Sequence, residues 1–445
     1  MKILTIGAGE IGFQLTKRLS QEHDMTLIER DPARVKRAAE QLDAFVLEGS
    51  GSSLKTLKDA NIEKIDILAA MTNSDEVNLI ACQLAKRLGV PTTIARIRNP
   101  EFTRPDFPLT GSELGADMII HPEKETADAI TRLIRQSTCT DIIEFEDGRV
   151  QVLGIRIESN SPVLRIPLKD LGQNFRELHL RIVAIKRKEQ TLIPRGEDVL
   201  TPGDQIFVVC DPQHIPQFLE LIGKSNTQIN DVMIVGGGLI GQFVSKDISD
   251  DIHIKIIENN ELKSQHIADE LSGALIIHGD GTDIDLLAVE GLMDMDAFIA
   301  VTGNDETNII ATLVARHLRV PRTIALVNKT EYMPITPTIG LDAVVSKQLI
   351  TVNAVQRYIR HRQVAAIAEI PGVDAHIIEF IASANAKITR KPLKNIDFPR
   401  YAIVGSVLQN GSVEIPKGDT QIHPDDRVIV FALPKALHKL EKLFK

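Results

Sequence analysis

The feature that most constrains this 445-residue chain is a glycine-rich turn that occurs twice, each time with one acidic residue 22 positions after its first glycine. Each turn follows a short apolar stretch, at residues 2–6 and 232–235, and each acid ends a second apolar run, at 25–28 and 254–257. The first copy consists of Gly7, Gly9, Gly12 and Glu29, and the second of Gly236, Gly238, Gly241 and Glu258.

Each glycine of such a turn has a mechanical reason. The first permits the tight turn off a strand, the second lets the backbone approach a pyrophosphate, and the third lets the following helix pack closely on the strand. Phosphates then bind the free backbone N–H groups at the helix start, and an acid about 20 residues on binds a ribose hydroxyl. One such match is weak evidence, whereas two at the same spacing predict two Rossmann units.

Further segments repeat in the same order at an offset of 230 residues. Residues 49–51 correspond to 279–281, 72–76 to 302–306, and 88–91 to 318–321, while 115–120 resembles 340–345 at a slightly smaller offset. Strand-like and helix-like stretches alternate through both halves, which is typical of a doubly wound parallel sheet. Most apolar residues are aliphatic, since aromatic residues make up 4% of the chain. An aliphatic composition is typical of parallel sheets that are buried on both faces. The sequence therefore predicts a duplicated unit.

After each repeat the pattern changes to short alternating strands separated by proline and glycine turns, closed by a helix. We therefore expect an α/β fold with two doubly wound, parallel-sheet Rossmann domains, each followed by a small α+β subdomain. The expected boundaries are 1–121, 140–224, 230–347 and 363–445, with a linker at 224–229. Four domains of about 111 residues each are close to the common domain size.

Composition limits the environment and the partners. The net charge of −9 argues against nucleic acid as the main partner, because a basic footprint would be expected. The three cysteines are isolated and odd in number, which favours a reducing cytosolic compartment.

No signal peptide is visible, and no apolar run approaches the roughly 18–20 residues of a membrane span. We expect a soluble protein, which could still sit against a membrane protein.

The sequence contains few candidates for catalytic residues. A Rossmann dehydrogenase needs a catalytic base, and the twelve histidines show no metal-ligand or catalytic spacing. The best candidate, His121, corresponds to Ser346 in the repeat, so a satisfied structural histidine is the better interpretation. Asp75 and Glu76, like Asp305 and Glu306, are interpreted as N-terminal caps of the helices that follow.

Other residues are candidates for ligand contacts. Thr72-Asn73 and Thr302-Gly303 end the fourth strand of each unit, at the sheet edge where Rossmann ligands bind. Arg96, on the fifth strand, is either a planar fork for phosphate or half of a surface ion pair, and position alone favours neither. Leu326 stands at the equivalent place in the second unit.

The chain resembles the regulatory subunit of the Trk potassium-uptake system, the TrkA family. The resemblance lies in the doubled glycine motif, the two acids, T-N-S-D-E at 72–76, A-R-I-R at 95–98 and the terminal L-E-K-L-F. The resemblance covers nearly the whole chain and implies tandem RCK domains, the regulators of potassium conductance. The candidate residues of the first site are Gly7, Ala8, Gly9, Glu10, Ile11, Gly12, Glu29, Ser50, Thr72, Asn73 and Arg96. Those of the second are Gly236, Gly237, Gly238, Leu239, Ile240, Gly241, Glu258, Asp280, Thr302 and Gly303.

The resemblance implies a non-enzymatic role. Such a protein binds NAD or NADH, with ATP, ADP or AMP as further candidates, and assembles as a homotetrameric ring under a membrane potassium-translocating subunit, which it gates. It would be cytoplasmic and held at the inner face of the membrane by that partner. The alternatives are an NAD-dependent oxidoreductase with a duplicated Rossmann unit, a regulator of another transporter, and a structural protein with vestigial nucleotide sites.

Overall fold

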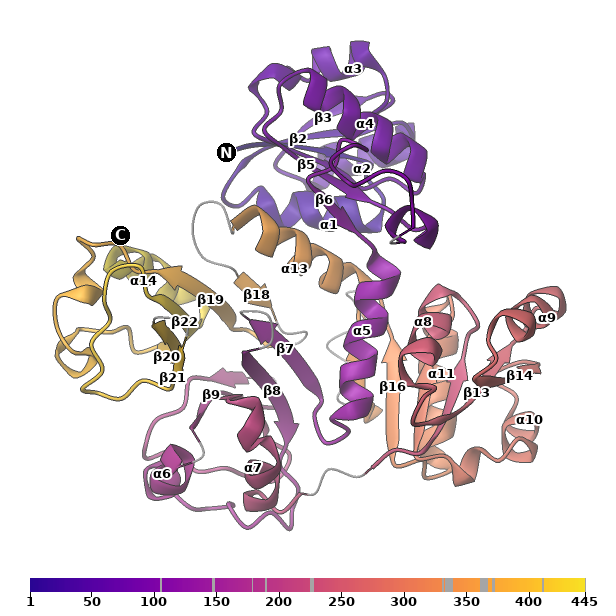
Figure 1. Cartoon of the computed structure of the whole chain (residues 1–445). Helices are drawn as coiled ribbons and strands as arrows, with labels where there is room; N and C mark the ends of the chain where they lie inside the picture. Colours follow the sequence, from indigo (N-terminus) through magenta and orange to yellow (C-terminus); the bar gives the residue numbers. More distant parts are fainter. Residues whose placement is uncertain are drawn as a thin grey trace. The chain divides into compact units, whose positions relative to one another are not determined.

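The computed structural model of the chain describes residues 1–104, 106–145, 149–177, 179–188, 190–224, 228–329, 332, 339–360, 367–369, 373–409 and 412–444 (Figure 1). The predicted linker at 224–229 lies partly outside them.

The first repeat forms a six-stranded parallel sheet in the order β3-β2-β1-β4-β5-β6. This is the strand order of the Rossmann fold, with the crevice for a ligand where the order reverses. Its strands are β1 Lys2–Ile6, β2 Asp24–Glu29, β3 Phe45–Glu48, β4 Ile67–Ala70, β5 Thr92–Arg96 and β6 Met118–Ile120. Its helices are α1 Glu10–Leu19, α2 Pro32–Gln41, α3 Leu54–Asp59 and α4 Asp75–Arg87, and α5 Pro122–Arg135 follows β6.

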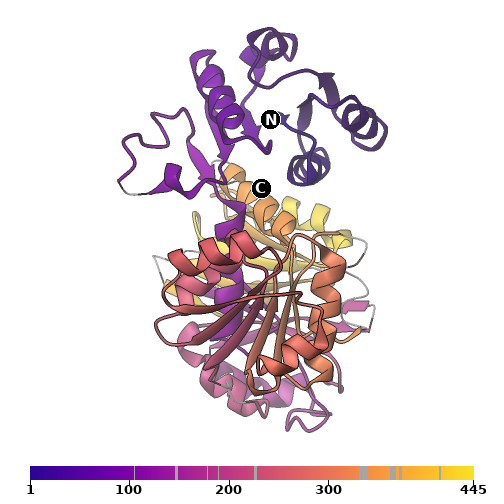
Figure 2. The same cartoon turned by 90° about the vertical axis from the view of Figure 1, so that its right-hand side faces the viewer.

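The second repeat builds the same sheet, in the order β14-β13-β12-β15-β16-β17, with helices on both faces (Figure 2). Its strands are β12 Asp231–Val235, β13 His253–Glu258, β14 Ala274–His278, β15 Ala297–Ala300, β16 Arg322–Leu326 and β17 Ala343–Val345. Its helices are α8 Leu239–Ile248, α9 Glu261–Glu270, α10 Ile284–Val289 and α11 Asp305–His317, and α13 Lys347–Arg360 follows β17. The predicted duplicated Rossmann architecture is confirmed.

Each small subdomain contains a five-stranded antiparallel sheet, ordered β10-β9-β11-β8-β7 in the first and β18-β19-β22-β20-β21 in the second. The first contains β7 Asp141–Phe145, β8 Val150–Arg156, β9 Leu180–Arg187, β10 Gln190–Leu192, β11 Gln205–Cys210, α6 Leu168–Glu177 and α7 Ile215–Leu221. The second contains β18 Ile367–Glu369, β19 His376–Ile381, β20 Ala402–Gln409, β21 Ser412–Glu414, β22 Arg427–Ala432 and α14 Leu437–Phe444.

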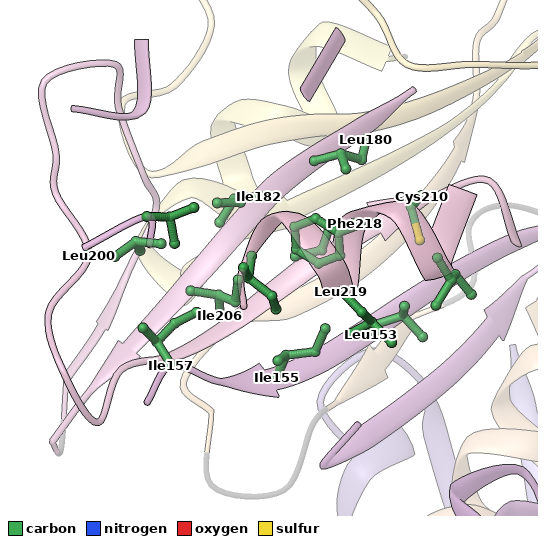
Figure 3. Packing of buried hydrophobic residues seen from close by; sticks show 14 of the residues in the cluster. Leu153, Ile155, Ile157, Leu180, Ile182, Leu200, Ile206, Cys210, Phe218 and Leu219 are labelled. Atoms are coloured by element: carbon green, nitrogen blue, oxygen red, sulfur yellow. The ribbon is translucent and has the colours of Figure 1, made fainter. Parts of the chain in front are cut away.

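The core of the first small subdomain lies between its sheet and its closing helix. Phe218 and Leu219 of α7 pack with Leu153, Ile206 and other buried aliphatic side chains from the strands (Figure 3). On the other side of the sheet, Phe207 belongs to a second apolar cluster that includes Ile377 and Phe431 of the second small subdomain. The two small subdomains therefore bury a common apolar interface.

The helices that follow the two Rossmann sheets are exchanged between the halves. The first part of α13, which continues from β17, forms a compact unit with the first Rossmann sheet. There, Arg18 Nη1 of α1 donates to Asn353 Oδ1 at 3.1 Å. In turn, the end of α5 belongs to the unit of the second Rossmann sheet, where Arg322 donates to the carbonyl of Cys139 and Arg135 Nη2 donates to the Asp247 carbonyl at 3.1 Å. The halves are consequently not independent pieces, which chain order did not indicate.

A substitution at Gly405 tests the interface between the small subdomains. A Cβ atom at this position would lie 3.0 Å from Val209 Cγ2 and 3.4 Å from Val183 Cγ1, which leaves little room. We expect Gly405→Val to overpack the interface, to cost about 1–3 kcal/mol and to lower the midpoint of urea unfolding.

The matched control is Gly303→Val, because a Cβ atom at Gly303 would meet no atom within 4 Å. This change should stay within about 0.5 kcal/mol of the unsubstituted chain. Equal midpoints for the two variants would contradict the tight packing at Gly405.

Candidate functional site

Two of the three glycines in each motif are required by the fold itself. Gly7 has a φ of +96° and Gly236 a φ of +112°, a left-handed backbone that favours glycine. A Cβ atom on Gly12 would overlap the carbonyl oxygen of Gly7, and one on Gly241 would overlap that of Gly236. These glycines bring the start of each helix against the end of its strand, as the motif predicted.

The middle glycine is not required by any protein contact. A Cβ atom on Gly9 would meet only Arg34 Nη1, at 3.9 Å, and one on Gly238 would meet no atom within 4 Å. Both are N-cap residues of their helices, α1 and α8, and neither provides a side-chain hydrogen bond to the first turn. Each helix thus presents backbone N–H groups to a space that only the glycine leaves open. This arrangement fits a phosphate group.

The two acids hold the glycine loops. Glu29, which is 8% exposed, accepts from the backbone N–H groups of Ala8 at 2.5 Å, Arg30 at 2.7 Å and Asp31 at 2.9 Å. A carboxylate offers about four acceptor positions, so these three N–H groups leave one acceptor position of Glu29 unused.

The second acid has a similar set of partners. Glu258 accepts from the N–H groups of Gly237 and Asn260, both at 3.1 Å, and from the Lys263 ammonium. Lys263 corresponds to Arg34 in the first repeat, which lies beside Gly9. A cation therefore lies next to each glycine loop, and the motif search did not identify either one.

The loop after the fourth strand is held by an asparagine in each repeat. The Oδ1 atom of buried Asn78 accepts from the Thr72 hydroxyl at 2.7 Å and from its backbone N–H at 3.0 Å, and Nδ2 donates to the Arg96 carbonyl at 2.7 Å. Asn308 makes the same bonds to Thr302 and to the Leu326 carbonyl, at 2.7, 2.8 and 2.9 Å. The sequence reasoning missed both asparagines, although they also match at the offset of 230.

The predicted helix caps are wrong, because the four acids Asp75, Glu76, Asp305 and Glu306 lie in the first turns of α4 and α11 and not at their N-caps. The N-cap residues of α4 and α11 are Ser74 and Asn304, whose side chains accept from the N–H groups of Val77 and Thr307. Asp75 instead accepts from the backbone N–H groups of Arg98 and Asn99 at 2.8–3.0 Å, and Asp305 does the same for residues 328 and 329. These carboxylates hold the loop that follows the fifth strand through its backbone N–H groups.

The loops after the third strand differ between the repeats. Ser50 Oγ lies 3.0 Å from Ser52 Oγ, whereas Asp280 accepts from the backbone N–H and the hydroxyl of Thr282, both at 2.8 Å. The Thr282 hydrogen bonds hold the pKa of Asp280 below its usual value. Asp280 therefore adds a negative charge to the second crevice that the first does not have.

Arg96 distinguishes the first site from the second. It is 6% exposed, so it is not a surface arginine. Its Nη1 atom donates to Asn73 Oδ1 at 2.9 Å, while Nε has no hydrogen-bond partner in the described part of the chain. Burial lowers the pKa of Arg96, and the charge of Glu123 opposes that shift. In the second site Gly303 replaces Asn73 and Leu326 replaces Arg96, so both residues of this hydrogen-bonded pair are missing there.

The reactive groups of the described residues are poorly placed for catalysis. Burial raises the pKa of the Cys82, Cys139 and Cys210 thiols to about 12, which keeps them protonated and inert. His121 is buried, and burial lowers its pKa. Among the residues that the structure describes, no three His, Cys, Asp or Glu side chains are grouped as metal ligands. Nor is any described helix long and apolar enough to cross a membrane.

Comparisons with known proteins identify both halves. The TrkA-N domain model matches residues 3–122 and 232–347, and the TrkA-C domain model matches 152–223 and 377–445. The chain is 35% identical to Trk system potassium uptake protein TrkA homolog 2 of Methanosarcina mazei over the full length of both proteins. It is 33% identical to Trk system potassium uptake protein TrkA of Azorhizobium caulinodans, covering 100% of this chain and 99% of that protein.

Solved structures share the fold at low identity. The GsuK channel superposes with a TM-score of 0.64 at 19% identity, covering 99% of this chain and 78% of the channel chain. The GsuK channel bound to NAD gives a TM-score of 0.63 at 20% identity, covering 100% and 78%. A GsuK structure bound to ADP gives 0.52 at 17% identity, covering 81% and 70%.

Proposed function

This chain belongs to the TrkA family of Trk system potassium uptake proteins, and from that premise we propose that it is a nucleotide-binding regulatory subunit of a potassium transporter. The observation that supports this most strongly is the doubled glycine cradle. Gly9 and Gly238 leave open, at two uncapped helix starts, the space that a pyrophosphate occupies in a Rossmann site.

The proposed ligands are NAD or NADH, with ATP, ADP or AMP as alternatives. The first site uses the N–H groups of the α1 turn for phosphate, Glu29 for a ribose hydroxyl, and Arg96 for additional phosphate charge. The second site uses the α8 turn and Glu258 but has Leu326 where the first has Arg96. By analogy of fold alone, the NAD-bound and ADP-bound GsuK structures support this ligand class.

Regulation follows from linkage. A nucleotide that binds two arrangements of the domains with different affinity shifts their populations by that difference. We propose that the partner is a membrane potassium-translocating subunit, and that the chain acts from the cytoplasm at the inner face of the membrane.

The scarcity of catalytic groups favours a regulator over an oxidoreductase. Turnover of carbonyl substrates with NADH well above background would support the oxidoreductase instead.

We further propose that four copies assemble as a ring through their Rossmann units. Apolar side chains are exposed at equivalent positions of both repeats. Ile80 on α4 is 49% exposed and Ile310 on α11 is 51% exposed, and the pairs Phe45/Leu275 and Leu54/Ile284 are also exposed. An apolar position exposed twice on the same helix face fits a contact that both units make with neighbouring copies.

The binding sites can be tested by calorimetry on the full-length chain. We expect NADH or ATP to bind, and Gly9→Val and Gly238→Val each to abolish binding at one site, because a branched side chain fills the phosphate space. The unfolding midpoints should stay close to that of the unsubstituted chain, because a Cβ atom at either position meets no close neighbour. Normal binding by a folded variant would show that its glycine loop is not a phosphate cradle.

The assembly can be tested by light scattering. The unsubstituted chain should have the mass of a tetramer, and Ile80→Glu combined with Ile310→Glu should reduce it, because buried unpaired carboxylates destabilise an apolar contact. The control is Lys36→Glu with Lys246→Glu, which alters charge without placing a carboxylate on these apolar positions. A monomeric unsubstituted chain would contradict the ring.

A further inference from the structure

A buried carboxylate lies beside the first site and has no counterpart in the second. Glu123, the second residue of α5, is 4% exposed. Its Oε1 atom lies 3.4 Å from Lys347 Nζ and 3.5 Å from Arg98 Nε. Its Oε2 atom lies 3.7 Å from His121 Nδ1 and has no hydrogen-bond partner among the described residues. A buried charge of this kind is costly unless neighbouring charges compensate it.

Arg96 and Glu123 are neighbours in the fold, because Arg96 of β5 pairs with Ile120 of β6, three residues before Glu123. Among the charges that act on the buried Arg96 guanidinium, Glu123 is the strongest. Burial raises the pKa of Glu123, but the charges of Lys347, Arg96 and Arg98 and a backbone hydrogen bond together outweigh that effect, and the net pKa is below its usual value. Glu123 is therefore ionised. It contacts Arg98 of its own half and Lys347 of the other half, and its charge also acts on Arg96.

Lys347 comes from the second half of the chain. It is the first residue of α13, which continues from β17 and packs on the first Rossmann unit (Figure 1). The next residue, Gln348, donates from Nε2 to Glu10 Oε2 at 3.0 Å, and Glu10 opens the helix that follows the first glycine loop. The first site therefore has two polar neighbours contributed by the second half.

The second repeat cannot form the same arrangement. Aligning β6 with β17 places Gln348 at the position of Glu123, and Pro122 at the position of Lys347. The second site also has Leu239 in place of Glu10 and Leu326 in place of Arg96. The charged link between a site and the opposite half is thus a property of the first site alone.

We infer that Lys347 controls how strongly the first site binds a phosphate-bearing nucleotide, by competing with Arg96 for the carboxylate of Glu123. When Lys347 neutralises Glu123, Arg96 is available to a phosphate group. When α13 withdraws Lys347, Glu123 attracts Arg96 and the site loses affinity for anions. This inference rests on the proposed nucleotide site.

Linkage makes the effect reciprocal. If Lys347 strengthens phosphate binding, a bound phosphate must strengthen the contact between Lys347 and Glu123 by the same factor. A nucleotide in the first site would thereby hold α13 on the first Rossmann unit, and α13 continues from the last strand of the second. Occupancy of one site is in this way transmitted to the opposite half of the chain.

Calorimetry on the full-length chain in a Gly238→Val background, with ATP and with uncharged adenosine as probes, tests the inference. We expect Lys347→Met to weaken ATP binding about tenfold, a typical coupling between sites, and to leave adenosine binding unchanged. Lys347→Arg should bind ATP normally. Lys329→Met, which removes an exposed lysine beside the second site, is the matched control and should not affect ATP binding.

The decisive variant combines Lys347→Met with Glu123→Gln. Once the carboxylate is gone, the loss of Lys347 no longer leaves a negative charge to attract Arg96. This pair should therefore bind ATP as tightly as the background chain, a rescue that a purely structural role would not produce. Glu123→Gln alone should bind ATP at least as tightly, which tests the competition even if Lys347→Met fails to fold.

The binding results distinguish a wrong nucleotide site from a wrong role for Lys347. No binding of ATP by the background chain would overturn both the proposed site and the inference. ATP binding that is unchanged in folded Lys347→Met, or not restored in the pair, would overturn only the inference.

Discussion

The structure depends on the turn that joins β1 to α1, and on its repeat between β12 and α8. The left-handed backbone of Gly7 and the missing side chain of Gly12 press the helix start against the strand end. That close approach leaves the first N–H groups of the helix without a side-chain cap, beside a glycine that no protein contact requires. Glu29 then fixes the loop through three backbone N–H groups. The fold thus presents uncapped backbone N–H groups at a helix start, twice, which is the arrangement that favours anions.

The same scaffold carries different charges in its two copies. Asn73 orients Arg96 in the first site. The second site has Leu326 at the position of Arg96 and Gly303 at the position of Asn73. The charge of Glu123 acts on Arg96, and Glu123 in turn contacts Lys347 of the other half. The second crevice instead carries Asp280. A duplicated binding unit can in this way keep its geometry and divide its tasks between a charge-sensitive site and a less charged one.

Much of this could be predicted from sequence because it is local. The glycine spacing, the acids and the alternating pattern specify strand, turn and helix within about 30 residues, and the 230-residue offset revealed the duplication. Contacts between distant segments were less accessible. Asp75 sits where caps often occur, yet it binds a loop 23 residues away. The exchange of α5 and α13, and with it the contact of Lys347 with Glu123, depends on tertiary packing that no local pattern encodes.

We propose that nucleotide binding by this chain controls potassium uptake. The most direct measurement is potassium uptake by cells of the native organism in which the chain is deleted and then restored. The account predicts that deletion impairs uptake, that the unsubstituted chain restores it, and that a folded chain carrying both Gly9→Val and Gly238→Val does not restore normal control. Uptake that is unaffected by the deletion, or fully restored by the doubly substituted chain, would contradict the account.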